Sequence, residues 1–266
     1  MILIDDIEDP RIAHYATLKG IRQSSFDDRL VVAESEKVVQ SLLKSPLEVV
    51  SMLALPQYYE AFGKLAENIP QKYIATEELM ADIVGYRLHQ GVMAAALPPQ
   101  STPLDAMEGP VVVLNGLCNA ENVGAIMRNA LAFGVNNILV DSATSPPFLR
   151  RSVRVSMGAV FSMNVHTTEN LGGALKVLKE RGYTIVGADL TEPVIDAGQY
   201  RFPEKYALVI GTEGHGLQED VVEACDLCVR VPISSQVDSL NAAAATAVLL
   251  FAALRDIGHT TLLPPR

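Results

Sequence analysis

Two polar loops in the C-terminal half of the sequence, the first of them rich in glycine, have the residue types that bind small molecules. The first loop, 211–216 (GTEGHG), follows the apolar run 206–210, and the second follows the apolar run 227–231 and ends at 239–241 (SLN). Three glycines permit backbone conformations with positive φ and let the main chain approach a bound molecule closely. Because open α/β sheets bind ligands where their strands end, the two loops predict a ligand-binding crevice.

A single arginine is another candidate for chemistry. The apolar run 111–114 is followed by the pattern Asn122-x-Gly124-x-x-x-Arg128, which predicts a helix over 123–133 capped by Asn122. Gly124 would lie in the first turn, where the missing Cβ admits a close neighbour, and Arg128 would project from the second turn. A lone helical arginine most often pairs with a carboxylate on a solvated face, so Arg128 by itself does not establish a site.

A cluster of three arginines is the third candidate. The formal net charge of −10 argues against non-specific nucleic-acid binding, which depends on neutralising phosphates, but it leaves room for a local basic patch. Arg150, Arg151 and Arg154 form the only dense patch in the sequence, and their spacing places Arg150 or Arg151 on one helical face with Arg154. A solvated face and a phosphate-binding face are equally good interpretations. If RNA is a ligand, we expect one of its phosphates here.

Other motifs give little support for further chemistry. Cys225-x-x-Cys228 has no second cysteine pair and no histidine at a metal-binding spacing, so no metal site is expected. His89 and His215 lack a serine or cysteine partner at a recognisable spacing, which leaves a hydrolytic triad unsupported. The glycines of 211–216 follow neither the dinucleotide-binding nor the phosphate-loop pattern, so a nucleotide-dependent dehydrogenase is the weaker enzyme interpretation.

The elements that would position these residues fall into two domains. The chain of 266 residues is long enough for one large or two medium domains. The proline-rich, polar stretch 98–103 predicts a linker over 98–108, between a first domain over 1–97 and a second over 109–266. Residues 1–97 contain no catalytic constellation, so we interpret them as a binding module.

Helix and strand patterns alternate in both domains. In the first we predict helices over 11–21 (capped by Asp9), 34–43, 57–67 and 76–84, and strands over 30–33, 49–55, 72–75 and 92–97. In the second we predict strands over 111–114, 137–141, 160–165, 184–188, 206–210 and 227–231, and helices over 123–133, 148–157, 171–181 and from 241 to 255. This alternation implies an α/β fold with a mainly parallel sheet covered on both faces.

Composition also bears on the cellular compartment. No apolar run reaches the length needed to span a bilayer, and the N-terminal MILIDDIEDP lacks the features of a signal peptide. Three cysteines without extracellular features predict a cytoplasmic protein.

Several blocks of the sequence together resemble the SpoU/TrmH branch of the SPOUT RNA methyltransferases. The blocks are Asn122-x-Gly124-x-x-x-Arg128, Ser156-x-Gly158-Ala159, 208–217 (LVIGTEGHGL), and 231–233 (VPI) with 239–241 (SLN). They follow the family's order and spacing over 111–256, which makes the resemblance specific. The N-terminal part, with Ala33-Glu34-Ser35 and His89-Gln90-Gly91, is similar to the family's substrate-binding domain, which is L30e-like.

The resemblance implies a fold, an activity and partners. It implies a mainly parallel sheet flanked by helices with a C-terminal trefoil knot, a topology that general rules of chain connection would argue against. It also implies S-adenosyl-L-methionine as the cofactor, RNA as the partner, a homodimer that builds the site, and methyl transfer to a ribose 2′-hydroxyl. The extra N-terminal domain suggests a structured RNA, and ribosomal RNA is preferred over transfer RNA. Neither a metal nor a membrane partner is expected.

The resemblance also assigns residues to the site. The polar residues expected in catalysis are Asn122, Arg128, Glu213, Ser239 and Asn241. The cofactor contacts, made mostly by backbone at strand ends, are carried over to Gly187, Ala188, Asp189, Ile210, Gly211, Glu213, Gly214, Val231, Ile233 and Leu240. Capping of a helix, or a bridge to the partner subunit, is the alternative role of Glu213, and Ser239 and Asn241 can cap the last helix.

Arg128 is expected to act through its charge. In the family the matching arginine is proposed to activate the 2′-hydroxyl, but a guanidinium is almost never deprotonated in proteins. We therefore hypothesise that Arg128 binds the adjacent phosphate and orients the hydroxyl, and that the phosphate accepts the proton.

The sequence departs from the family pattern at three places. Family members commonly carry Asp-Pro where this chain has Ala120-Glu121, Asn where it has Thr212, and Met-Gly where it has Ile233-Ser234. Arg128, Glu213 and Asn241 are retained, so we expect an active enzyme. The non-enzymatic alternative is an RNA-binding protein with a degenerate methyltransferase domain.

Overall fold

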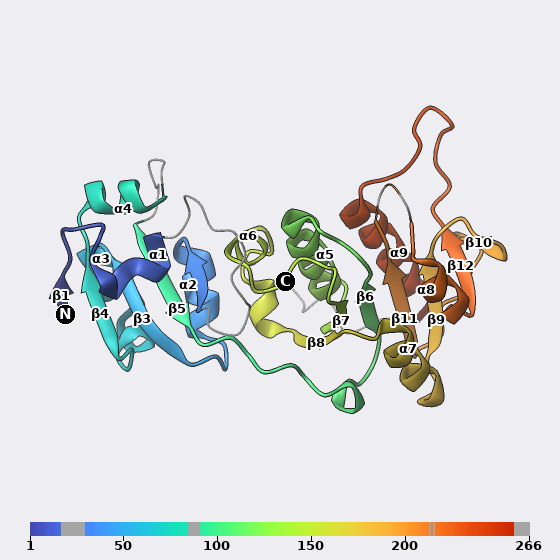
Figure 1. Ribbon diagram of the computed structural model, residues 1–266, viewed down its shortest axis with the longest axis horizontal. Coiled ribbons are helices and arrows are strands. Elements are labelled where there is room, and N and C mark those ends of the chain that lie inside the picture. The colour runs from blue at the N-terminus through green and yellow to red at the C-terminus, as the bar shows by residue number, and fades with distance from the viewer. Residues whose placement is uncertain (17–29, 85–90, 213, 215, 258–266) are drawn as a thin grey trace. The chain divides into compact units, whose positions relative to one another are not determined.

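The computed structural model describes residues 1–16, 30–84, 91–212, 214 and 216–257, and Figure 1 shows their elements in chain order. The chain forms two compact units. The first contains Met1–Gln100 together with Phe148–Phe161, and the second contains Ser101–Pro147 and the chain from Ser162 onward. The chain therefore leaves the first unit after Gln100, returns to it for a short excursion at 148–161, and leaves it again.

The first unit is built on a mixed five-stranded sheet in the order β1-β4-β3-β5-β2. Its strands are β1 (Ile2–Leu3), β2 (Val31–Glu34), β3 (Val49–Ala54), β4 (Gln71–Ile74) and β5 (Val92–Ala96). Strands β1, β3 and β4 are parallel, and β5 is antiparallel to both β2 and β3. The helices are α1 (Ala13–Ala16), α2 (Glu36–Leu43), α3 (Pro56–Phe62), α4 (Glu77–Val84) and α6 (Arg150–Val155).

Three predicted helices of the first unit differ from the structure. Asp9 is an N-cap as predicted, but it caps a 3-10 turn at Pro10–Ile12, which α1 follows. The rest of the predicted helix lies outside the described residues. Glu34 belongs to a strand because it pairs with Met93 in the ladder, and α2 begins after the sharp turn at Ser35, whose φ is 81°. The helix predicted over 57–67 ends at Gly63, where φ is 46°, and continues as a 3-10 turn.

The second unit is built on a seven-stranded sheet in the order β10-β12-β9-β11-β6-β7-β8, in which every neighbouring pair is parallel. The strands are β6 (Val111–Leu114), β7 (Asn137–Asp141), β8 (Asn164–Thr168), β9 (Thr184–Ala188), β10 (Val194–Asp196), β11 (Tyr206–Ile210) and β12 (Leu227–Arg230). The predicted mainly parallel α/β fold is thus confirmed. The trefoil knot stays a prediction.

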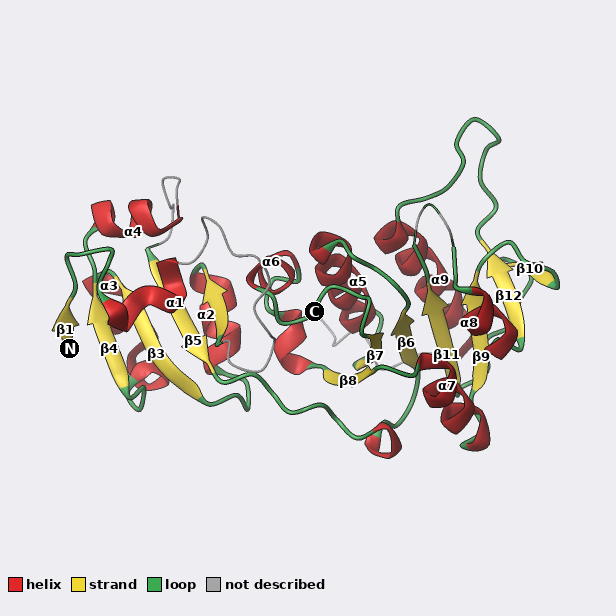
Figure 2. Cartoon of the chain, in the orientation of Figure 1, coloured by secondary structure: helices red, strands yellow, loops and turns green. Residues whose placement is uncertain are grey.

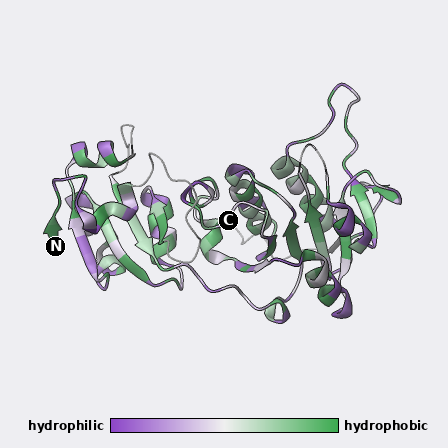
Figure 3. Cartoon of the chain, viewed as in Figure 1, coloured by the Kyte–Doolittle hydropathy of each residue, from purple (hydrophilic) through white to green (hydrophobic). Residues whose placement is uncertain are grey.

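Helices cover both faces of this sheet, as Figure 2 shows. They are α5 (Ala120–Ala132), α7 (Leu171–Glu180), α8 (Glu219–Ala224) and α9 (Ala242–Ile257). The apolar faces of α7 and α8 pack on alternate strand residues such as Val111, Val113 and Val209. The intervening Val112 and Leu208 are equally buried and point to the opposite face, so these strands are apolar throughout, as in Figure 3.

Several predicted elements of this sequence region are wrong in detail. The strand predicted over 160–165 is a 3-10 turn at Ala159–Ser162 followed by β8, because the buried Val160 and Phe161 pack in the first unit and the ladder begins only at Asn164. Asn122 does not cap α5; Asn119 does, through a 2.8 Å hydrogen bond from the Glu121 amide. The short elements α8 and β10 were not predicted.

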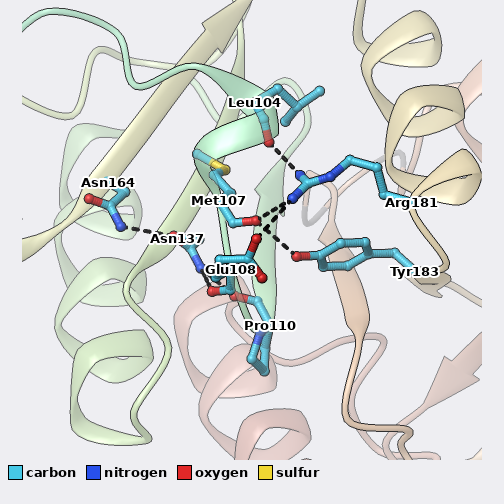
Figure 4. A network of polar contacts seen from close by, with 8 residues as sticks. All are labelled: Leu104, Met107, Glu108, Pro110, Asn137, Asn164, Arg181 and Tyr183. Carbon is cyan, nitrogen blue, oxygen red and sulfur yellow. Dashed lines mark hydrogen bonds and ion pairs between the residues drawn. The ribbon is translucent and has the colours of Figure 1, made fainter.

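The segment 101–108 is fixed to the second unit by backbone and side-chain hydrogen bonds. The Thr102 amide donates to the Val165 carbonyl at 2.8 Å. Arg181 donates to the carbonyls of Leu104 (2.6 Å) and Met107 (2.8 Å), and the Tyr183 hydroxyl donates to the same Met107 oxygen (3.2 Å), as Figure 4 shows. Residues 101–108 of the predicted linker are therefore bound to the second unit.

Candidate active site

The glycine turn after β11 is closed by its own backbone. The Thr212 amide donates to the Gly216 carbonyl, and the Gly216 amide donates to the Thr212 carbonyl, both at 3.0 Å. A Cβ on Gly211 would overlap the Gly216 carbonyl, and Gly216 itself has a φ of 66°. These two glycines are therefore required by the turn itself. Gly214 is exposed, whereas Glu213 and His215 lie outside the described residues.

Asp189, at the end of β9, holds the exit of this turn. One carboxylate oxygen accepts from the Leu217 amide at 3.0 Å, and the other accepts from the amide (3.0 Å) and hydroxyl (2.7 Å) of Thr191. Partial burial alone would raise the pKa of Asp189, but these hydrogen bonds favour the charged form and lower the pKa below its ordinary value. The side chain of Asp189 thus holds the glycine turn after β11 in place at its exit.

A second set of hydrogen bonds that holds the glycine turn comes from the end of β6, and it was not predicted from the sequence. The Asn115 side chain accepts from the Gln218 amide at 3.0 Å and donates to a carboxylate oxygen of Asp141, at the end of β7, at 2.8 Å. Both residues are buried. The available signal was two polar residues placed directly at the ends of apolar strands, where a buried polar group needs a specific partner.

The remaining predicted cofactor residues lie at three adjacent strand ends. Strand β9 lies between β11 and β12, so Ala188, Ile210 and the chain after Arg230 come out at the same edge of the sheet. Val231 and Leu240 are half-buried, and Ile233 is exposed. Gly187 is buried against the sulfur atoms of Cys225 and Cys228 and the side chain of Leu217, so its small size is already explained by packing.

Asn241 connects the second predicted loop to the helix that carries Arg128. Its side-chain amide donates to the Asn122 side-chain oxygen at 2.9 Å, and its own oxygen accepts from the Ala243 amide at 3.0 Å, which caps α9. The capping role of Asn241 and the link to Asn122 therefore coexist. Ser239 is exposed in the loop before this cap.

Arg128 itself is exposed on α5. Within the part of the chain that the structure describes, no carboxylate forms an ion pair with it, in contrast to the pairing expected of a lone helical arginine. A guanidinium in this situation keeps its five donors available for an anionic ligand.

The three arginines of α6 lie in the first unit, and one of them has a structural role. Arg150 donates to Glu34 at 2.8 Å and to the Tyr15 carbonyl at 2.8 Å, and the side chains of Arg150 and Glu34 are only 15% and 5% exposed. Arg154 reaches the other oxygen of Glu34 at 3.4 Å. Arg151 is exposed. The predicted shared face of Arg150 and Arg154 exists, but it is directed at a buried carboxylate.

The cysteine pair of the second unit lies in surroundings that disfavour thiolates. Burial raises the pKa of the Cys225 thiol to about 12 and also raises the pKa of Cys228, so neither is a ready thiolate. Among the described residues no group of three or more His, Cys, Asp or Glu side chains could hold a metal ion. Over the same residues, no helix combines the length and apolar character that crossing a membrane requires.

Comparison with known proteins agrees with this architecture. Residues 109–251 match the SpoU rRNA Methylase family. An uncharacterized tRNA/rRNA methyltransferase of Mycobacterium bovis is 31% identical over 96% of this chain and 91% of its own length. The 23S rRNA (guanosine-2′-O-)-methyltransferase RlmB of Ralstonia nicotianae is 34% identical over 73% of this chain and 81% of its own. The chain therefore belongs to the SpoU family of RNA methyltransferases.

Solved structures share the fold at lower identity. The SpoU methyltransferase AviRb from Streptomyces viridochromogenes, in complex with AdoMet, superposes with a TM-score of 0.79 at 22% identity and covers 93% of this chain and 97% of its own. An AdoMet-bound rRNA methyltransferase from Sinorhizobium meliloti gives a TM-score of 0.80 at 23% identity, with coverage of 97% and 98%.

Proposed function

We propose that this protein transfers the methyl group of S-adenosylmethionine to a ribose 2′-hydroxyl of a structured RNA, with ribosomal RNA preferred over transfer RNA. The observation that carries the proposal is the hydrogen bond between Asn241 and Asn122. It fixes the loop after β12 against the helix that presents Arg128, so a cofactor bound at the strand ends would share a site with an available guanidinium. The RlmB relative, named as a guanosine-2′-O-methyltransferase, supports the choice of acceptor.

The strand ends have the chemistry that an adenosine group requires. Ile233 and Leu240 offer apolar contact, and Gly214 is exposed and has no side chain to keep a ligand from its backbone. Gly187, Ala188 and Val231 would contribute mainly backbone at the same edge. When bound, the cofactor supplies a methyl group on a sulfonium, which is already strongly electrophilic. The protein's task is therefore alignment, and in the best cases alignment lowers a barrier by about 7–11 kcal/mol.

Arg128 is proposed to orient the acceptor. Its guanidinium binds the phosphate next to the target ribose and holds the 2′-oxygen in line with the methyl group. The bound cofactor would supply the methyl group for the new bond to the 2′-oxygen, and the hydroxyl proton would pass to a phosphate oxygen. The products are S-adenosylhomocysteine and the 2′-O-methylated RNA. Ser239 lies in the loop before the α9 cap, where it is available to contact the ribose.

A homodimer is proposed to complete the site, and the outer face of α9 supports it. Ala244, Val248, Phe251 and Arg255 recur at helical spacing and are all exposed. Val248 is 43% exposed and Phe251 is 62% exposed. Large exposed apolar side chains on one face of a helix are typical of an interaction surface. We assign this face to the second copy of the chain.

The first unit is proposed to bind the RNA outside the site of methylation. Because Arg150 is occupied by Glu34, the phosphate contact predicted for the arginine cluster rests on Arg151 and on the exposed part of Arg154, whose side chain is 39% exposed. This contact would position the RNA without reading its bases.

The test is transfer of radiolabelled methyl from S-adenosylmethionine to RNA from cells that lack the protein, followed by size fractionation and alkaline hydrolysis. Label in an alkali-resistant dinucleotide is expected, because 2′-O-methylation blocks cleavage at that position, and the labelled size fraction identifies the RNA. Label in mononucleotides would mean base methylation. Absence of cofactor binding, measured as an unchanged melting temperature at saturating S-adenosylmethionine, would favour the RNA-binding alternative.

A further inference from the structure

Asn115 contacts both ends of the glycine turn. Its backbone amide donates to the Ile210 carbonyl, at the entrance of the turn, at 2.9 Å. Its side-chain oxygen accepts from the Gln218 amide, just beyond the exit, at 3.0 Å. The preceding amide, that of Leu217, is held by Asp189 at 3.0 Å. Two consecutive amides at the exit are therefore fixed by side chains from two different strands.

The orientation of the Asn115 side chain is set by its donors. The side-chain nitrogen donates to Asp141 at 2.8 Å and to the Gln218 side-chain oxygen at 3.1 Å. The same Asp141 oxygen accepts from the Gly116 amide at 2.9 Å, and its other oxygen accepts from the Thr144 amide and hydroxyl. The Asp141 oxygens thus face donors in all four contacts, and only an amide at position 115 can both donate to them and accept from the Gln218 amide.

We propose that Asn115, oriented by Asp141, is a positioning residue for methyl transfer that fixes the glycine turn against the loop leading to α5. The role rests on the proposed cofactor site at this turn. Residue 115 lies in the chain between β6 and α5, and its hydrogen bonds span the turn after β11. Asn115 thereby fixes the position of the glycine turn, which is expected to bind the cofactor, relative to the helix that carries Arg128.

The substitution that tests this is Asn115→Asp, which keeps shape and removes the donor. Two carboxylates would then face each other at the distance of the present hydrogen bond, and one of them would take up a proton more readily. At about pH 8, where both are charged, repulsion displaces the Gln218 amide and the Kd for S-adenosylmethionine should rise about 10- to 100-fold. At about pH 5.5 the shared proton restores the donor and most of the affinity returns.

Asn137→Asp is the matched control. Asn137 is also a buried asparagine of the same sheet, but it lies at the start of β7 and donates to the carbonyls of Glu108 (2.5 Å) and Pro110 (3.2 Å), as Figure 4 shows. This substitution should lower the melting temperature and leave the Kd unchanged at both pH values. Equal loss of affinity in both variants would overturn the proposal, because it would indicate general destabilisation. Unchanged affinity in Asn115→Asp would overturn it as well.

Hydrogen exchange separates this proposal from the proposed site. In the protein without cofactor, the amides of Leu217 and Gln218 should exchange slowly in the native sequence and fast in Asn115→Asp at about pH 8. Slow exchange in both would refute the positioning role. Independently, S-adenosylmethionine should protect the segment 208–218 of the native protein. Cofactor binding without such protection would place the cofactor elsewhere and reject the proposed site, whatever Asn115 does.

Discussion

Replacing Arg150 by alanine should destabilise the first unit by about 3 kcal/mol. The substitution leaves the Glu34 carboxylate, whose side chain is 5% exposed, without its 2.8 Å partner. Removal of one partner of a buried ion pair costs about 3–5 kcal/mol, and loss of the donor to the Tyr15 carbonyl adds about 1 kcal/mol. Arg154, at 3.4 Å from Glu34, remains and offsets part of this loss.

The assay is calorimetric unfolding of the full-length protein. A loss of about 3 kcal/mol should lower the Tm of the first unit by roughly 10 °C. Arg151→Ala is the control on the same helix; it removes the same charge from an exposed position and should cost clearly less stability than Arg150→Ala. The double variant Glu34→Met, Arg150→Met should recover most of the lost stability, because no charge is left buried.

Two outcomes would refute this reasoning. An Arg150→Ala protein that unfolds within about 2 °C of the native protein would mean that the ion pair contributes little beyond what a surface pair does. A double variant as unstable as Arg150→Ala would mean that the cost does not come from a buried carboxylate that has lost its 2.8 Å partner.

Four further predictions concern the second unit. Arg128→Lys keeps the charge but loses the planar fork, so single-turnover methylation should fall about 100-fold while the Kd for S-adenosylmethionine is retained; undiminished activity would contradict the proposed role. Gly211→Ala should abolish cofactor binding, measured by calorimetry, because its Cβ overlaps the Gly216 carbonyl. Phe251→Glu should convert the proposed dimer to a monomer in sedimentation. Because hydrogen bonds lower the pKa of Asp189, the stability it contributes is complete at neutral pH and is lost as the pH falls through that lowered pKa. Asp189→Asn should therefore flatten the acid limb of the unfolding profile below about pH 4, and an unchanged limb would contradict the assigned cause.

Four strands of the second unit, β6, β7, β9 and β11, begin and end at the predicted residues. They were predictable because each is a short run that is apolar at its centre. The errors arose where contacts with distant parts of the sequence determine the local secondary structure. Val160 and Phe161 have the residue types of a strand, but they are buried in the other unit, and no local pattern contains that information.

Residue types alone predicted a ligand-binding crevice at the two loops, whereas Arg128 and Asn241 were assigned to the site through the family resemblance. The structure joins the helix of Arg128 to Asn241 through Asn122, and the site itself stays a prediction. The capping role assigned to Asn122 was wrong, because α5 already begins at Ala120 and is capped by Asn119 through the Glu121 amide, which leaves Asn122 inside the first turn. The Asn115–Asp141 pair joins residues 26 apart in sequence, and a pairing over that distance is visible only in three dimensions.

The excursion of the chain at 148–161 has a consequence for synthesis. The first unit contains residues that leave the ribosome only after β6, α5 and β7 of the second unit have been made. At about 5–20 residues per second, this unit waits several seconds for α6, and until then Glu34 has neither arginine. Strand β2, at the edge of its sheet, meanwhile lacks the helix that packs against it. The nascent N-terminal unit thus has an uncovered edge strand during that interval, and its folding is completed only when residues 148–161 have been made.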